Sequence, residues 1–214
     1  MPIFWKEVKT ELYNKRRISI LVLCIFFCIY ISRKSNLQDV IISVLSVVLM
    51  LSIYNSIRNA YCLGSILATP MDVKQYCNEK TLYVGMKTIA SIVICYVAYV
   101  LNIVQIDNKE SFIYVTYVSI IIAMYILILY MNLEVILLYL GRKRIYLIYI
   151  LSSIGTYLLR IIVVEVSGIK KILLAFTVMA LQYICFNKLC SNLNYEKIEK
   201  AWEVIYGSTI KISS

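Results

Sequence analysis

The chain has 214 residues, of which 61% are hydrophobic and only 16% are charged, and its mean hydropathy is +0.80. This composition is too apolar for a soluble globule and is typical of a membrane protein. The formal net charge of +10 arises from 22 Lys and Arg residues, but most of them flank long apolar runs, which favours anchoring of membrane spans and argues against a nucleic-acid partner. No His occurs, so the usual general base near neutral pH and the commonest metal ligand are absent.

The N-terminal segment 3–17 has the pattern of an amphipathic helix that lies in the membrane interface. Phe4, Val8 and Leu12 recur every four residues with Trp5 beside them, while the charged side chains fall on the other positions. Trp prefers the membrane–water boundary, so an interfacial helix is favoured over a solvated tail.

Six apolar runs approach the length of about 20 residues that a helix needs to cross the hydrocarbon of a bilayer. They predict six transmembrane helices within 18–187, at 18–32, 40–57, 88–106, 111–133, 145–164 and 172–187. The first run ends in "YISRKSN" without a small-x-small cleavage pattern, which favours a retained span over a signal peptide. The outer loops are too short to fold alone. We therefore expect an all-α membrane protein with a single transmembrane domain, 1–214, and a tail at 188–214.

The distribution of Lys and Arg predicts the orientation of this six-span plan. With the N-terminus inside, fifteen of them lie in cytoplasmic segments and five lie in outer loops. Positive charge concentrates on the cytoplasmic side of membrane proteins. Both termini and the segment between the second and third spans are therefore predicted to be cytoplasmic.

That segment, "LGSILATPMDVKQYCNEK" at 63–80, is the main polar interruption of the chain. Gly64 suits the end of the second span, Thr69 suits the N-cap of a new helix, Pro70 its first position and Asp72 its third. The pattern predicts a short helix along the inner membrane face. From these residues alone, an ordinary capped connection and a surface for a partner remain equal alternatives.

The same stretch resembles the loop after the second span of ABC-2 type permeases, the membrane subunits of ATP-binding-cassette exporters. Leu67, Thr69, Pro70 and Lys80 match the leucine-rich turn, the Thr-Pro and the Lys before the third span of that family. The segment "FWKEVKTELYNKRR" is similar to the family's N-terminal elbow. The resemblance covers 3–17 and 63–80 as motifs and the rest of the chain as a six-span layout with both ends inside.

The resemblance implies an ABC-2, type V exporter-like arrangement in which 65–80 is a cytoplasmic coupling helix. This helix and the elbow would contact a separate ATPase, which would hold ATP and Mg²⁺, since the chain has no Walker loop of its own. A second permease copy, or a paralogous permease, would complete the transporter in the cell membrane of a bacterium. The implied ATPase-facing residues are Leu67, Thr69, Pro70, Met71, Asp72, Val73, Lys74, Tyr76, Trp5 and Glu7.

Two charged residues lie deep in the predicted spans. Glu134 is seven residues before Gly141, and Arg160 is sixteen residues after Arg144, about 10 Å and about 24 Å along a helix. A charge that faces lipid at such depth is costly, so both are expected to face protein or a cavity. They are candidates for a translocation path or gate and, equally, for polar ties between spans.

Two other functional classes have to be weighed. A membrane enzyme would need clustered acids or His on the span faces, and no HExxH, paired-Asp or Ser–His pattern is present. The seven Cys contain no CxxC pair, so neither a catalytic nor a metal site is predicted. A non-transporting immunity, sensor or assembly protein would look much the same but would need no ATPase. The substrate, whether peptide, drug or lipid, is not encoded in any recognisable pattern.

Overall fold

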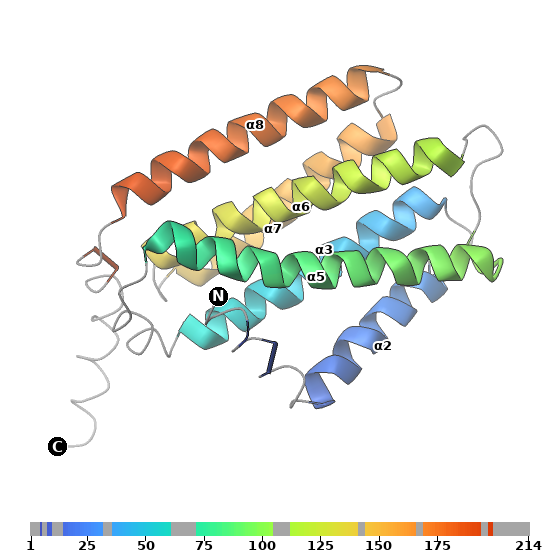
Figure 1. The fold of residues 1–214 in the computed structure, drawn as a ribbon, viewed down its shortest axis with the longest axis horizontal. Helices are drawn as coiled ribbons and strands as arrows, with labels where there is room; N and C mark the ends of the chain where they lie inside the picture. Colours follow the sequence, from blue (N-terminus) through green and yellow to red (C-terminus); the bar gives the residue numbers. More distant parts are fainter. Residues whose placement is uncertain are drawn as a thin grey trace.

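The computed structural model describes residues 5, 8, 9, 15–31, 36–60, 72–104, 112–140, 144–165, 169–193, 197 and 198. These form a bundle of long helices: α2 (Lys15–Ile31), α3 (Leu37–Ala60), α5 (Val73–Val100), α6 (Phe112–Leu140), α7 (Ile145–Arg160), the π-helix η2 (Ile161–Glu165) and α8 (Ile169–Asn192). Successive long helices run in opposite directions (Figure 1). We call the end of the bundle where α5 starts the Val73 end, and the opposite end the Val100 end.

Helix α3 lies at the centre of the bundle. It packs against α2, α5, α6 and α7, while α6 packs against α3, α5, α7 and α8. The buried face of α3 is almost entirely aliphatic and includes Ile41, Leu45 and Leu49. A helix that is apolar all round is buried or spans a membrane, and α3 is the most enclosed of the long helices.

Five helices among the described residues are long and apolar enough to cross a membrane, namely the helices at Leu37–Arg58, Val73–Val100, Phe112–Leu140, Ile145–Val163 and Lys170–Asn192. The predicted all-helical, membrane-spanning class is therefore confirmed at this level. The predicted first span corresponds to α2, which has 17 residues and a length of about 26 Å. This helix is shorter than each of the five spanning helices, so the sixth predicted span is not confirmed.

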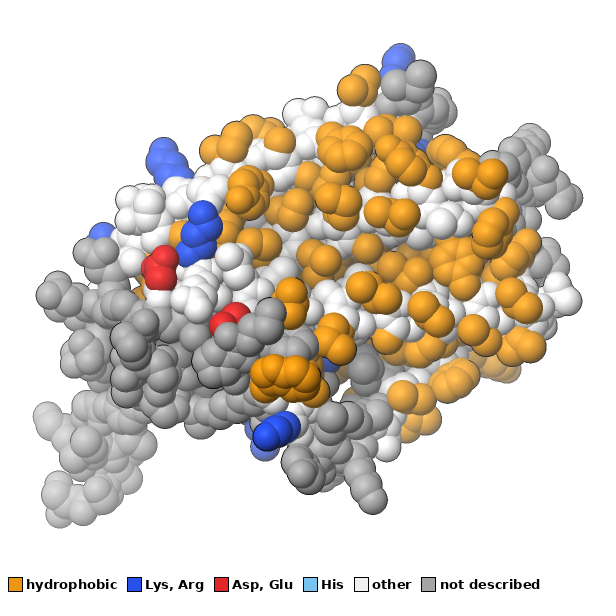
Figure 2. Space-filling view, in the orientation of Figure 1, with side chains coloured by type: hydrophobic (Ala, Val, Ile, Leu, Met, Phe, Trp, Pro, Cys, Tyr) orange, Lys and Arg blue, Asp and Glu red, His pale blue; other side chains and the backbone are white. Residues whose placement is uncertain are grey.

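The outer surface of the bundle is apolar over most of its length. On α5 an exposed stripe runs through Leu82, Met86, Ile89, Val93 and Val97, at the spacing of one helix face. Figure 2 shows hydrophobic side chains across the viewed face of the bundle and most of the charged ones near the Val73 end. An apolar surface of this extent needs lipid rather than water around it.

The start of α5 differs from the predicted short inner helix. Its described part, Val73–Lys80, is the first two turns of α5 and is continuous with the predicted third span. Asp72 takes the N-cap position with extended backbone and makes no side-chain capping bond, whereas the prediction places it third in the helix. The helix continues because Val73, Tyr76 and Cys77 are buried on its inner side. The predicted N-cap, Thr69, and Pro70 lie outside the described residues.

The end of α5 also differs, since the predicted span continues to Ile106 and the helix ends at Val100. Asn102 has a φ of 57°, the left-handed conformation that Asn tolerates better than most residues. The amide of Ile103 then donates to the carbonyl of Ala98, and that of Asn102 donates to Tyr99. A polar residue inside an apolar run therefore stops the helix.

Helices α6 and α7 approach each other closely at Gly155. A Cβ at this position would lie 2.6 Å from Leu129 Cδ2, and the hydroxyl of Tyr125 donates to the Gly155 carbonyl over 3.0 Å. After α7, η2 extends to Glu165 and α8 begins at Ile169. The three residues between them, 166–168, lie outside the described residues.

Candidate functional site

A buried ion pair joins α5 to α6 near the Val73 end. Lys80 Nζ lies 2.7 Å from Glu134 Oε1, and the two side chains are only 3% and 2% exposed. The hydroxyl of Tyr76 donates to the same carboxylate oxygen over 3.3 Å, and the Tyr76 ring lies 4.9 Å from Lys80 Nζ. Glu134 is thus enclosed by protein, as expected, and its partner is a lysine from the preceding helix.

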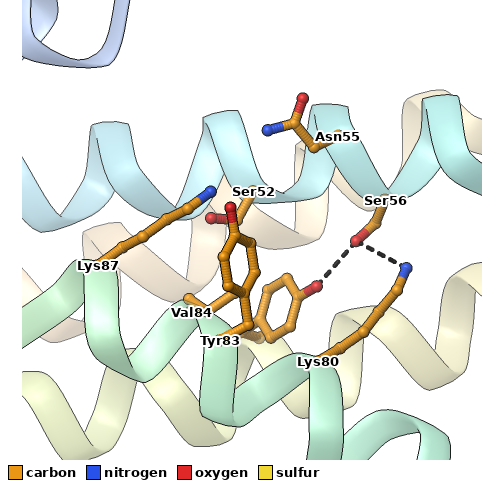
Figure 3. Close-up of a pocket in the computed structure, with 8 residues that line it drawn as sticks. Ser52, Asn55, Ser56, Lys80, Tyr83, Val84 and Lys87 are labelled. Atoms are coloured by element: carbon orange, nitrogen blue, oxygen red, sulfur yellow. Dashed lines mark hydrogen bonds between the residues drawn. The ribbon is translucent and has the colours of Figure 1, made fainter. Parts of the chain in front are cut away.

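The ion pair continues into α3 through hydroxyl groups. Lys80 Nζ donates to Ser56 Oγ over 3.3 Å, and Ser56 Oγ and Tyr130 Oη lie 2.8 Å apart. Figure 3 shows both contacts converging on Ser56. We call Lys80, Glu134, Tyr76, Ser56 and Tyr130 the polar network. It connects three helices with charge-assisted hydrogen bonds.

The polar network acts as a structural tie. Bringing two charges out of water is costly, and their attraction offsets this cost only when further hydrogen bonds satisfy both groups. Here Tyr76 serves the carboxylate and Ser56 serves the ammonium. A buried pair with this geometry favours one register of α5 against α6.

A second, apolar contact fixes the start of α5. Val73, Tyr76 and Cys77 pack with Val135 and Leu138 of α6, with Phe186 of α8, and with Leu193 and Ile198, which follow α8 in the chain. We call these eight residues the α5 anchor. Polar side chains lie on the opposite side of the same two turns, where Asp72, Lys74, Gln75 and Asn78 are exposed.

The predicted ATPase-facing residues divide accordingly. Asp72 and Lys74 are exposed at the Val73 end, whereas Val73 and Tyr76 are buried in the α5 anchor and present no surface to another chain. Trp5 is 58% exposed. Leu67, Thr69, Pro70, Met71 and Glu7 lie outside the described residues.

A polar groove lies at the Val100 end, between α3 and α7. Its volume is about 480 Å³, and it is lined by Asp39, Ile42, Ser43 and Ser46 of α3 and by Ser153, Thr156, Tyr157 and Arg160 of α7. On each helix these positions follow the spacing i, i+3, i+4, i+7, which describes one helix face. We call this feature the α3–α7 groove. Arg160, the last residue of α7, is exposed and lies in it.

Three of the five hydroxyl-bearing residues that line the groove are available to it mainly as acceptors. Ser46, Ser153 and Thr156 each donate to a carbonyl of their own helix, over 2.7, 2.9 and 3.0 Å respectively. Their protons are used within the helix, so the oxygen lone pairs remain for a guest. With the Asp39 carboxylate and the Arg160 guanidinium, the groove offers acceptors along its walls and one strong donor.

Glu134 and Arg160 were both predicted as candidates for a translocation path or gate or, equally, for polar ties between spans, and the structure places them in separate features. Glu134 belongs to the closed polar network, and Arg160 lines the open groove. No group of three or more acids or Cys arranged for a metal ion occurs in the part of the chain that the structure describes.

Sequence reasoning missed the pairing of Lys80 with Glu134, although a signal for it was present. Tyr76 precedes Lys80 by four residues, and Tyr130 precedes Glu134 by four, so each charge shares a helix face with a tyrosine. Opposite charges with matching tyrosines, near the facing ends of consecutive antiparallel spans, indicate a pair. Comparison with known proteins adds no further assignment, because no family model, curated protein or solved structure matches this chain.

Proposed function

We propose that this chain is the membrane-spanning permease subunit of an ATP-binding-cassette exporter of the ABC-2 type. In this proposal α2 completes a set of six spans, both termini are cytoplasmic, and the protein resides in a bacterial cell membrane. A separate ATPase binds ATP and Mg²⁺, and a second permease, identical or paralogous, completes the transporter. The cargo is a peptide, a drug or a lipid.

The observation that carries the proposal is the construction of the Val73 end. The first two turns of α5, Val73–Lys80, follow Thr69 and Pro70 in the sequence. They are fixed to the bundle by the α5 anchor and by the polar network. The same two turns expose Asp72, Lys74, Gln75 and Asn78. A force applied to this polar face reaches α5, α6 and α8 through buried contacts, as a coupling element requires.

The α3–α7 groove gives secondary support. A polar groove of about 480 Å³ between two apolar helices is unfavourable against lipid tails. It is favourable when it faces a second subunit or a polar cargo. Arg160 therefore keeps its proposed role in a path or gate, whereas Glu134 is better explained as a structural tie.

Co-purification tests the proposal. The full-length chain, tagged and extracted from the membranes of its own host, is expected to bring with it a P-loop ATPase. The variants Asp72→Arg and Lys74→Glu should lose that ATPase, because they reverse exposed charges on the polar face, while the yield of inserted chain stays unchanged.

The matched control is Lys188→Glu, which makes the same charge change at an exposed position of α8. It should retain the ATPase. If wild-type chain purifies without any ATPase, the proposal fails, and the immunity, sensor or assembly alternative takes its place. If Lys74→Glu and Lys188→Glu behave alike, the polar face is not the docking surface.

A further inference from the structure

The α3–α7 groove has a charged mouth and a hydroxyl-lined interior. Asp39 is the third residue of α3 and Arg160 is the last residue of α7, so both lie in terminal turns at the Val100 end. The lining continues along the two helices to Ser46 and Ser153, which lie seven positions away on each helix, or about 10 Å. Both helices are long and apolar enough to span a membrane. The mouth therefore lies near one membrane surface, and the floor lies within the apolar layer.

The two charges at the mouth are opposite and do not neutralise each other. Asp39 in a first turn and Arg160 in a last turn each suit the dipole of their own helix, so neither alone indicates a ligand. Within the part of the chain that the structure describes, however, neither makes an ion pair or a hydrogen bond. An acid and a guanidinium that line one groove without pairing are complementary to a guest that carries both charges.

The hydroxyl groups select the kind of positive group that this guest carries. Ser46, Ser153 and Thr156 donate to carbonyls of their own helices, so their oxygens accept. A primary ammonium brings three N–H donors to such acceptors. A quaternary ammonium brings none and is recognised by cages of aromatic faces, whereas Tyr157 is the single aromatic residue among those that line the groove. A primary ammonium is therefore favoured.

The negative group is best matched by a phosphate. The guanidinium of Arg160 presents a planar fork of donors that fits two phosphate oxygens at once. Ser43 and Tyr157 also line the groove, and their hydroxyls can donate to a further phosphate oxygen. An anionic head without an ammonium would leave Asp39 facing a like charge. The lining therefore favours a zwitterion over an anion.

The groove changes from polar to apolar along its length. Past Ser46 and Ser153, the next positions on the same helix faces are Met50 of α3 and Ile150 of α7. Met50 is half-buried and Ile150 is exposed, as is Ile154 beside it on α7. A polar mouth at the membrane surface that leads to an exposed apolar face fits an amphiphile better than a water-soluble zwitterion.

We propose that the α3–α7 groove binds the headgroup of a zwitterionic phospholipid with a primary ammonium, of the phosphatidylethanolamine type. Arg160 holds the phosphate, Asp39 and the serine and threonine oxygens hold the ammonium, and the acyl chains lie along α7. The volume of about 480 Å³ is within the range of about 300–1,000 Å³ that is usual for small-molecule sites. This binding requires neither the proposed ATPase nor a second permease, while a part for the lipid in transport would rest on the proposed function.

Native mass spectrometry of the full-length, delipidated chain in detergent tests the site. The chain is titrated with phosphatidylethanolamine, phosphatidylcholine and phosphatidylglycerol that have identical acyl chains. One phosphatidylethanolamine should bind per chain at concentrations at which the other two lipids leave the chain mostly unoccupied. Equal binding of the three lipids would overturn the proposal.

Soluble phosphoethanolamine distinguishes a lipid from a free zwitterion of the same chemistry. At the concentration of the lipid it should not displace bound phosphatidylethanolamine, because it has no acyl chains to lie on α7. Displacement at equal concentration would assign the groove to a water-soluble ligand and refute the lipid.

Variants locate the binding. Arg160→Gln removes a charged donor and should raise the half-saturating concentration of phosphatidylethanolamine roughly tenfold, and Asp39→Asn should abolish the preference over phosphatidylglycerol. The matched control is Arg58→Gln, the same change at an exposed position near the Val73 end of α3, which should bind like the wild type. Where a charge variant does not fold, Tyr157→Phe removes one hydroxyl and should weaken binding severalfold. Equal affinity of Arg160→Gln, or of Tyr157→Phe, and Arg58→Gln would refute this site.

A second copy of the chain is the other occupant that the same spectra detect. A wild-type dimer that binds no phosphatidylethanolamine, and that becomes a monomer in Arg160→Gln, would assign the groove to a contact between copies and overturn the proposal. The ATPase takes no part in these measurements. A failure of lipid binding therefore leaves the co-purification of an ATPase as a separate result, and the reverse also holds.

Discussion

The polar network and the α3–α7 groove are both built from polar side chains on the faces of apolar helices, yet they are opposites in physical character. In the network the charges are paired at 2.7 Å and almost fully buried. In the groove the Arg160 side chain is exposed and the volume is about 480 Å³. A depth argument from sequence treats Glu134 and Arg160 alike. The comparison shows that depth along a span does not decide between a buried tie and an open site, and that the neighbouring side chains do.

Breaking the tie should have the largest effect. Glu134→Gln or Lys80→Met leaves one buried charge without its counter-charge and should destabilise the chain by about 3–5 kcal/mol. The measurement is the free energy of unfolding in detergent micelles. The double variant Lys80→Met with Glu134→Leu should recover much of this loss, because neither charge remains. A double variant as unstable as the sum of the single ones would show that the two residues do not act as a pair.

The close approach of α6 and α7 comes next. Gly155→Val places a side chain where a Cβ alone would lie 2.6 Å from Leu129 Cδ2, and overpacking of this kind should cost about 1–3 kcal/mol. The control is Gly85→Ala, whose Cβ would meet Leu127 at an ordinary 3.8 Å. It should be neutral or stabilising, because Ala favours a helix over Gly. Unfolding transitions of the two variants compare them directly.

Thiol labelling sharpens the contrast between open and closed polar sites. In a chain whose seven native Cys are replaced by Ala, Ser46→Cys in the groove should react with a small water-soluble reagent roughly tenfold faster than Ser119→Cys. The two serines are matched, since each donates over 2.7 Å to the carbonyl four residues before it, but Ser119 is buried with 2% exposure. Equal rates would mean that the groove is closed to water.

The smallest effect is expected at Arg160. Because this side chain is exposed, Arg160→Gln should change the free energy of unfolding by no more than about 0.5 kcal/mol. Its influence should instead appear in export by the assembled transporter. A loss of stability like that of Glu134→Gln would contradict the assignment of the groove as a site and make Arg160 a tie as well.

Sequence reasoning located the helices because long apolar runs have few alternatives in a bilayer. The helix ends were harder to predict. At 73–80 the polar residues predicted a separate helix. The segment instead continues into α5, because Val73, Tyr76 and Cys77 are buried on one side of it. Near residue 101 the apolar residues predicted that the helix continues. It ends at Val100, and Asn102 adopts a left-handed conformation. The pairing of Lys80 with Glu134 spans 54 positions, and a separation of that size is decided by helix packing rather than by local pattern.

The unbroken length of α5 has a mechanical consequence. Its 28 residues form a rod of about 42 Å, and Gly85 lies close to its midpoint, where Leu127 touches it only in ordinary van der Waals contact. If the rod tilts as one body about that midpoint, a rotation of about 10° displaces each tip by about 3.5 Å, in opposite directions. Motion delivered to one membrane surface would then emerge inverted at the other, without any hinge in between.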